Sequence, residues 1–437
     1  MKLHFVISLV LFNVVSAANL AAQQAPLTLG QCVEMALRHN LNLKATQQDA
    51  LLVQAKIAEA KASLLPKFYG TADYKLYGDL PTQLMPAVIF GGAPDTYREA
   101  QFGVPHNIAA NVQGSLPLYN RAARSAVAAA ENGLEIARLQ AQKTEEEIIW
   151  EVSAAWYNAQ ILANQRQFLQ GNIANLEKSV TTVGLLFQQK LASGMDLDRL
   201  LLQKQATQTQ LTSLEANYAT AFNALKFHAG LPLADSISIA AETETPAPET
   251  APEKPPLDVE LADRQLRLLE SEKQVVRAAL YPTAGLYGLA GYTGFGKTGG
   301  NGFLDFYLVN FAGVQANVPI FNGMATKRRL EQKDVEIAKT QLRKEFLLEK
   351  NALEKANARL QLETARQDLA AFQANVGLAQ GIFEKTQLLL SEGLATVTDL
   401  LQTDNAVREA QQNYIAALVQ LRRAELEYKR ATGNLRF

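Results

Sequence analysis

The chain of 437 residues has very few of the side chains that build disulfides and metal centres. It contains one cysteine, Cys32, so a disulfide within the chain is impossible. Its four histidines are scattered, which argues against a metal site made of histidine and cysteine. The net charge of -1 gives no basic surface for nucleic acid. The sequence therefore predicts no metal ion, no cofactor and no nucleic-acid partner.

Long apolar runs are missing beyond the N-terminus. The first residues combine Lys2, an apolar run from Phe5 to Val15 and small residues at 16–18, a pattern typical of a secretory signal peptide, which we predict over 1–22. No later segment has about 20 apolar residues in a row, so the sequence predicts no membrane-spanning helix in the mature chain. A β-barrel remains as a way to cross a membrane.

Proline is absent from two long blocks, 118–231 and 320–437, and all 15 prolines lie outside them. Proline costs about 3 kcal/mol in a helix interior, so its absence is what continuous helix requires. We predict that a long helix fills most of each block, over roughly 122–188 and 323–390, and that a shorter helix follows it.

The two halves of the chain share one order of motifs, although most of their residues differ. In each half a proline ends a helical run, a turn-rich stretch follows, and a second proline leads into the long helix. These prolines are Pro66 and Pro117 in the first half, and Pro282 and Pro319 in the second. A duplicated unit implies pseudo-symmetry within one copy of the chain.

A segment rich in proline and glutamate separates the halves. Residues 242–256 hold five prolines and four glutamates, a composition that cannot form a core. We predict a first repeat at 23–240, a linker at 241–256 and a second repeat at 257–437. Each repeat should hold a helix, a β-hairpin and a long helical hairpin; the β-hairpins are predicted at 67–119 and 283–321, and the helical hairpins at 122–229 and 323–432.

Between the helical blocks, apolar and polar residues alternate with period two. Residues 67–77 and 107–118 place apolar side chains on one face and polar ones on the other, the pattern of a transmembrane barrel strand. Residues 284–296 are rich in glycine and follow the pattern less cleanly. Four strands cannot close a barrel, and an open edge is not tolerated in lipid, so other copies of the chain must complete it.

One pattern points to different chemistry. Residues 291–298 read Gly-Tyr-Thr-Gly-Phe-Gly-Lys-Thr and fit a phosphate-binding loop. The helix that such a loop requires does not follow, because Gly299, Gly300 and Gly302 come next. We interpret the segment as a glycine-rich hairpin tip. No catalytic motif stands out elsewhere, so we predict no catalytic residues and no enzymatic activity.

The order of these motifs resembles the TolC family of outer-membrane efflux proteins over essentially the whole mature chain. The residues that carry the resemblance are Thr28-Leu29, Ala36-Leu37 and Asn40-Leu41, the proline-marked switches between helix and strand, and paired motifs that end at Gly230 and Gly433. The resemblance implies a mostly α fold with a transmembrane β-barrel contribution. Three copies would share one 12-stranded barrel and an α-helical periplasmic tunnel.

The resemblance also implies a function. The chain would form a passive exit duct in the bacterial outer membrane, with most of its mass in the periplasm, for a tripartite efflux or type I secretion system. Its partners would be two further copies in a homotrimer, outer-membrane lipid, a periplasmic adaptor protein and an inner-membrane RND or ABC transporter. The alternative from another class is a periplasmic coiled-coil scaffold without a pore, which would not need the alternating strands.

Two aspartates, Asp196 and Asp399, resemble the acidic positions near the periplasmic aperture of this family. In a threefold assembly each would form a ring of carboxylates that selects cations. The family's second acid, one turn later, is replaced here by Gln402, and Asp198 or Asp404 would have to supply charge nearby. Both aspartates also fit the third position of a capping box at a helix start, so a capping role stays open.

The turns before these aspartates are the third candidate feature. Their small and apolar residues resemble the place where the helical hairpins of an adaptor dock in this family. Alternatively, the two leucines only close the end of the bundle. The candidate contact residues are Leu191, Ala192 and Ser193 in the first half and Leu394, Ala395 and Thr396 in the second.

Overall fold

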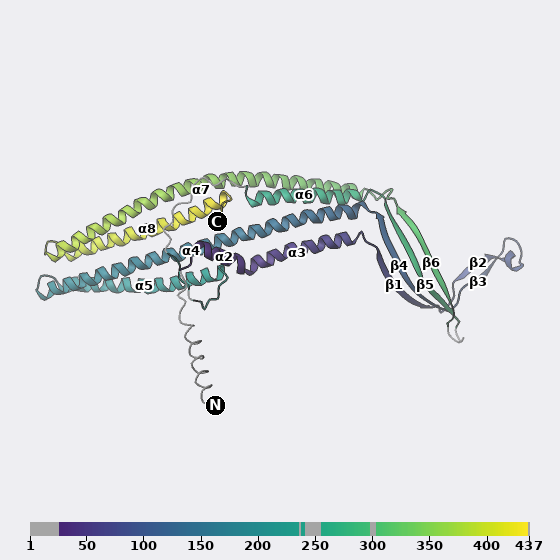
Figure 1. The fold of residues 1–437 in the computed structure, drawn as a ribbon, viewed down its shortest axis with the longest axis horizontal. Coiled ribbons are helices and arrows are strands. Elements are labelled where there is room, and N and C mark those ends of the chain that lie inside the picture. Colours follow the sequence, from purple (N-terminus) through teal and green to yellow (C-terminus); the bar gives the residue numbers. More distant parts are fainter. Residues whose placement is uncertain (1–25, 236, 241–254, 298–302, 436–437) are drawn as a thin grey trace, which may run out of the picture. The chain divides into compact units, whose positions relative to one another are not determined.

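The computed structural model describes residues 26–235, 237–240, 255–297 and 303–435. The signal peptide predicted at 1–22 lies outside the described residues, as does most of the predicted linker. Long helices and antiparallel strands make up the described chain (Figure 1). In chain order the elements are α2 (Leu29–His39), α3 (Leu41–Ala62), β1 (Lys67–Leu76), β2 (Thr82–Pro86), the 3-10 helix η1 (Ala87–Phe90), β3 (Tyr97–Gln101), β4 (His106–Tyr119), α4 (Arg121–Gln188), α5 (Gly194–His228), α6 (Leu257–Ala278), β5 (Thr283–Gly296), β6 (Phe303–Asn317), α7 (Ala325–Ser391) and α8 (Val397–Ala431).

The chain divides into two compact units that do not coincide with the two sequence halves. The helical unit consists of Met1–Asp49, Ala137–Ala262 and Arg343–Phe437, and the strand unit of Ala50–Ile136 and Asp263–Leu342. Each unit takes segments from both halves of the sequence. The division into two repeats and a linker stays a prediction about the sequence.

The duplicated arrangement of long helices and β-hairpins is confirmed. Helices α4 and α7 have 68 and 67 residues, and α5 and α8 have 35 each. The long helices begin and end within a few residues of the predicted limits, because proline-free sequence allows every interior amide to donate to the preceding turn.

Helix α8 buries an apolar seam with heptad spacing. Leu400, Val407 and Leu421 are buried at intervals of seven or a multiple of seven, and the small residues Ala417 and Ala424 are buried beside them. Leu400 and Val407 pack in one cluster near the end of the helical pairs, and Leu421 and Ala424 pack in another further along. Alanine in such a seam lets neighbouring helices approach closely.

A second core gathers around Trp156 of α4. Its side chain is fully buried with those of Cys32 of α2, Leu43 of α3 and Leu225 of α5. Leu426 of α8 belongs to the same cluster, so helices from both ends of the sequence share one apolar cluster within the helical unit. Burying large apolar side chains in this way supplies most of the driving force for packing the helices.

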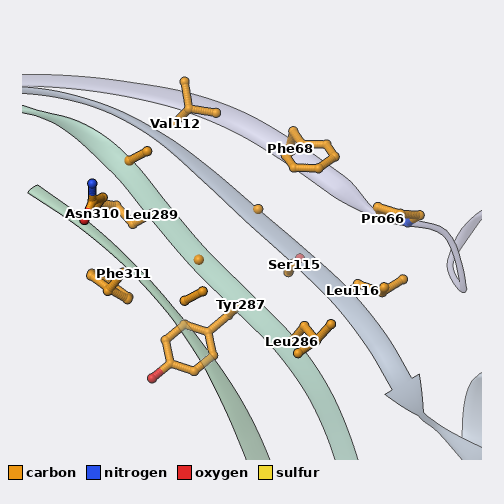
Figure 2. Close-up of a pocket in the computed structure, with 14 residues that line it drawn as sticks. Pro66, Phe68, Val112, Ser115, Leu116, Leu286, Tyr287, Leu289, Asn310 and Phe311 are labelled. Carbon is orange, nitrogen blue, oxygen red and sulfur yellow. The ribbon is translucent and has the colours of Figure 1, made fainter.

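The four long strands form one antiparallel sheet in the order β1-β4-β5-β6. Phe68 lies opposite Gly114, Asn111 opposite Gly291, and Leu289 opposite Phe311. Residues that lie opposite each other share a face, so the register fixes two faces of the sheet. The apolar face predicted for the first hairpin runs on to β5 and β6, and a groove of about 710 Å³ on the sheet is lined by residues of all four strands (Figure 2).

The segment between β1 and β4 holds more structure than a loop. Strands β2 and β3 pair as a separate small sheet, and η1 lies between them. The strands have five residues each, and β2 directly follows Pro81 and ends at Pro86, although prolines in a sequence favour turns. By contrast, Gly291 to Gly296 of the pattern that fits a phosphate-binding loop lie within strand β5 and not at a hairpin tip, and residues 298–302 lie outside the described residues.

Candidate functional site at the helix turns

Two matching turns connect α4 to α5 and α7 to α8, both within the helical unit. Two residues after each long helix ends, the backbone takes the left-handed conformation, at Lys190 with φ 62° and at Gly393 with φ 76°. The next amide, of Leu191 or Leu394, donates back into the last helical turn at 2.8 Å. This hydrogen bond satisfies one of the carbonyls that a helix leaves open at its C-terminus.

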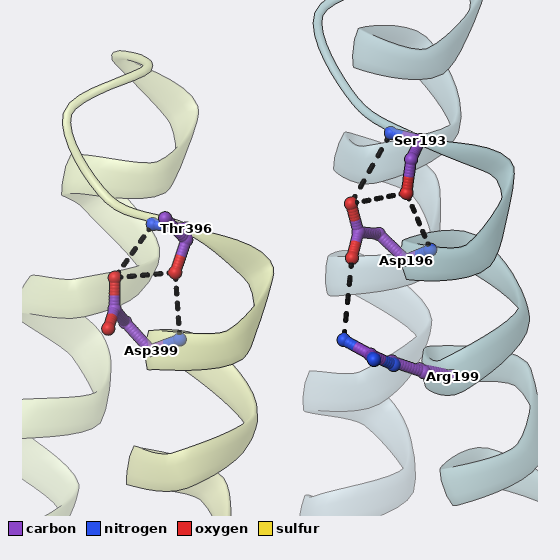
Figure 3. A network of polar contacts seen from close by, with 5 residues as sticks. All are labelled: Ser193, Asp196, Arg199, Thr396 and Asp399. Atoms are coloured by element: carbon purple, nitrogen blue, oxygen red, sulfur yellow. Dashed lines mark hydrogen bonds and ion pairs between the residues drawn. The ribbon is translucent and has the colours of Figure 1, made fainter.

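The first turn leads into a complete capping box at the start of α5. The Asp196 amide donates to Ser193 Oγ at 3.2 Å, and the Ser193 amide donates to Asp196 Oδ2 at 3.3 Å. The Ser193 hydroxyl also donates to the same carboxylate oxygen at 2.7 Å (Figure 3). Arg199 lies one turn further on, with Nη1 3.9 Å from Asp196 Oδ1. A positive charge therefore stands beside this carboxylate.

The second turn repeats the box at the start of α8, with shorter distances. The Thr396 amide and hydroxyl donate to Asp399 Oδ2 at 2.9 and 2.6 Å, and the Asp399 amide donates to Thr396 Oγ1 at 3.1 Å (Figure 3). The Thr396 hydroxyl first, and its backbone amide second, lower the pKa of Asp399. Asp399 is exposed at the surface. The capping geometry thus holds an ionised carboxylate at this end of the bundle.

The turns themselves present apolar side chains to the outside. Leu191 and Leu394 are both 72% exposed, whereas Ala192 and Ala395 pack partly against the buried cluster of the helix ends. Within one copy of the chain the leucine side chains are therefore exposed, and the alanines add to the apolar cluster at the helix ends.

A buried carboxylate lies just behind the second turn. Asp404 of α8 is 3% exposed, and its Oδ2 lies 3.2 Å from Nε of Arg408. Burial raises the pKa of Asp404, and the nearby Arg408 opposes this effect. The Gln203 amide of α5, turned so that its oxygen faces the guanidinium, accepts from Arg408 Nη2 at 2.6 Å. Asp404 thus lies inside the seam, whereas Gln402 is exposed.

Two further polar contacts join the helix pairs and were missed from the sequence. Asn172 Nδ2 donates to Gln411 Oε1 at 2.7 Å, and Gln387 Nε2 donates to Ser179 Oγ at 3.2 Å. A signal existed, because Asp404, Gln411 and the buried Leu418 repeat with a period of seven beside the apolar seam.

None of the helices in the described part of the chain is both long enough and apolar enough to cross a membrane. A model of the outer membrane efflux protein family matches the chain in two stretches, residues 32–231 and 257–434. The chain belongs to the outer membrane efflux protein family. It is an outer-membrane protein of a family of channels rather than enzymes, and its function is that of an efflux exit duct.

Solved structures of several outer-membrane channels share the fold of this efflux protein. The outer-membrane channel OprN has a TM-score of 0.74, with 17% identity, and the match covers 93% of this chain and 90% of that one. VceC of Vibrio cholerae has a TM-score of 0.74 and 16% identity, and the match covers 93% of this chain and 96% of that one. The MtrE channel of Neisseria gonorrhoeae has a TM-score of 0.70 and 17% identity, and the match covers 93% of this chain and 89% of that one. Comparison with curated protein sequences gives no match.

Proposed function

We propose that three copies of this chain assemble into one passive exit duct that serves a tripartite efflux or type I secretion system. The observation that carries the proposal is the four-stranded sheet, in which β1 and β6 each have only one neighbour among the described strands. Unpaired strand edges cannot be left in lipid, where each unsatisfied amide costs several kcal/mol. Pairing β6 of one copy with β1 of the next removes both edges.

The faces of the first hairpin support a water-filled interior. Asp73, Lys75 and Asn111 lie on one face, and Phe68 and Val112 on the other. In a closed barrel the charged face turns inward to water and the apolar face outward to lipid.

Helix α7 supports association of the helical parts. Leu342, Phe346, Leu353 and Leu360 are between 60% and 67% exposed. Large apolar side chains at such spacing along a helix face form a stripe that a neighbouring helix covers. A neighbouring copy supplies such helices, so the stripe favours an α-helical tunnel built from several copies.

We propose that the helix turns lie at the periplasmic end of the duct, where the aperture opens. Asp196 and Asp399 would form carboxylate rings around the periplasmic aperture, and such rings attract cations. Leu191 and Leu394, with Ala192, Ser193, Ala395 and Thr396, would meet the hairpins of a periplasmic adaptor. The exposure of Leu191 and Leu394 supports this role, because both side chains remain available after the copy has folded. An inner-membrane RND or ABC transporter would supply the energy.

Single-channel recording of the purified protein in a planar lipid bilayer tests the duct, and native mass spectrometry of the same sample tests the number of copies. We expect a small, stable, cation-selective current and a mass of three chains. A protein that never inserts into the bilayer and stays in solution would reject the duct and favour the scaffold without a pore.

A further inference from the structure

The second β-hairpin differs from the first because large apolar side chains occupy much of both faces, although Thr293, Gln315 and Asn317 are polar residues on the second face. On the face that Asn111 and Asp73 occupy in the first hairpin, β5 and β6 carry aromatic and aliphatic residues. The register places six of them together: Tyr287, Leu289, Phe295, Tyr307, Val309 and Phe311. We call this set the aromatic strip. A transmembrane barrel strand with one face to lipid and one to water normally carries polar residues on the water face, so the aromatic strip is not explained by barrel formation alone.

The strip is ordered by ring contacts across the two strands. The rings of Tyr287 and Phe311 are 5.9 Å apart and meet edge to face, and those of Phe295 and Tyr307 are 5.8 Å apart. Gly313 lies opposite Tyr287, and a Cβ there would come within 3.0 Å of the tyrosine ring. The glycine therefore leaves the room that this ring occupies.

The rings remain open to solvent. Their exposed fractions lie between 40% for Phe295 and 54% for Tyr307. The strip carries no charge, and Asp305 is the only charged residue on this face among the paired residues of β5 and β6. The neighbouring strand β4 offers Asn111 and Gln113 on the same face. Exposed rings beside neutral amides suit a planar aromatic molecule with polar edges.

We propose that the aromatic strip contacts cargo on the inner wall of the duct, and that this cargo is a planar aromatic compound. The inference rests on the proposed function, because the strip becomes an inner wall only when the barrel closes. The charged residues of the first hairpin fix the orientation: Asp73, Lys75 and the strip share one face, and the charged residues cannot turn to lipid.

The test uses the full-length protein in a planar bilayer and two permanent cations as probes. N-methylquinolinium is planar and aromatic, whereas N-methylquinuclidinium carries the same charge on a saturated frame. We expect the aromatic cation to block the wild-type current at lower concentration. Replacing one ring pair, Tyr287→Ser with Phe311→Ser, should weaken block by the aromatic cation about fivefold to tenfold and leave block by the saturated one unchanged.

Two controls separate contact with the rings from damage to the fold. Tyr287→Phe keeps the ring and should keep the block. Tyr97→Ser removes an exposed aromatic residue of β3, outside the strip, and should behave as wild type. Equal block of wild type and the double serine variant would overturn the proposal while leaving the duct intact. The absence of any current from the wild type would instead reject the duct itself.

Cysteine accessibility provides a second measurement that does not depend on the double variant. The native Cys32 is fully buried, and burial raises its pKa to about 11, so it gives little background. A charged methanethiosulfonate should react with Phe311→Cys and reduce the current. Leu308→Cys, on the opposite face, should be silent. Silence of Phe311→Cys in a conducting channel would mean that another part of the assembly covers the strip, and would overturn the contact with cargo.

Discussion

Asn172 of α4 donates a hydrogen bond from Nδ2 to Oε1 of Gln411 of α8 at 2.7 Å, inside the packed seam of the helical unit. Their exposed fractions are only 4% and 8%. A satisfied pair of buried amides fixes how two helices align along their length, since any slip leaves both groups without a partner.

Asn172→Ala should therefore destabilise the protein by about 1–3 kcal/mol, because the Gln411 amide stays buried and loses its partner. Thermal or urea unfolding in detergent, followed by circular dichroism, measures the change. Asn413→Ala on the exposed face of α8 is the matched control and should change the free energy of unfolding by less than about 0.5 kcal/mol. Equal losses for the two variants would show that the buried pair has no special role.

Substitutions of the two residues in the left-handed conformation at the turns should change the stability of the protein in opposite directions. Lys190 occupies this conformation at a cost, whereas Gly393 occupies it without strain. Lys190→Gly should raise the melting temperature, with a gain of up to about 1 kcal/mol, and Gly393→Ala should lower it, with a loss of about 1–2 kcal/mol. Shifts of the same sign in calorimetry would rule out the left-handed strain as the cause.

Structural features that depend only on residues close together in the sequence could be predicted. Ser193-x-x-Asp196 and Thr396-x-x-Asp399 indicated capping boxes, and both are confirmed. The capping contacts span three residues, and the helix limits follow from proline, so neither depends on distant parts of the chain.

Features that depend on remote partners could not be predicted. Asn172 and Gln411 are 239 positions apart, and the period-seven repeat that includes Gln411 does not identify Asn172 as its partner. From the sequence alone Asp404 would be placed on the surface. In the structure it is buried, and Gln203 of α5 lies beside its neighbour Arg408. Whether a polar side chain is buried depends on the helix that packs on it. Polar positions with a period of seven therefore predict buried hydrogen bonds only when that neighbouring helix is known.

The two possible roles of Asp399 can be separated by comparing two substitutions. Thr396→Ala removes the cap at a cost of about 1 kcal/mol but keeps the carboxylate, so its conductance should match that of the wild type. Asp399→Ala removes cap and charge together and should enlarge the conductance and weaken block by divalent cations. Single-channel recording with added Mg²⁺ measures both effects. Identical traces for all three proteins would leave the carboxylate as a helix cap only.

The buried Asp404 predicts a pH dependence of stability. Burial raises its pKa above the value in the unfolded chain, and Arg408 offsets this only in part. For such a group the stability contribution is fully present below the unfolded pKa and is lost as pH rises through the folded pKa. Asp404→Asn cannot ionise, so its melting temperature should fall less than that of the wild type between acidic and neutral pH. Asp198→Asn, at an exposed position of α5, should keep the wild-type pH profile. If Asp404→Asn kept it as well, ionisation of the buried carboxylate would not be the source of the dependence.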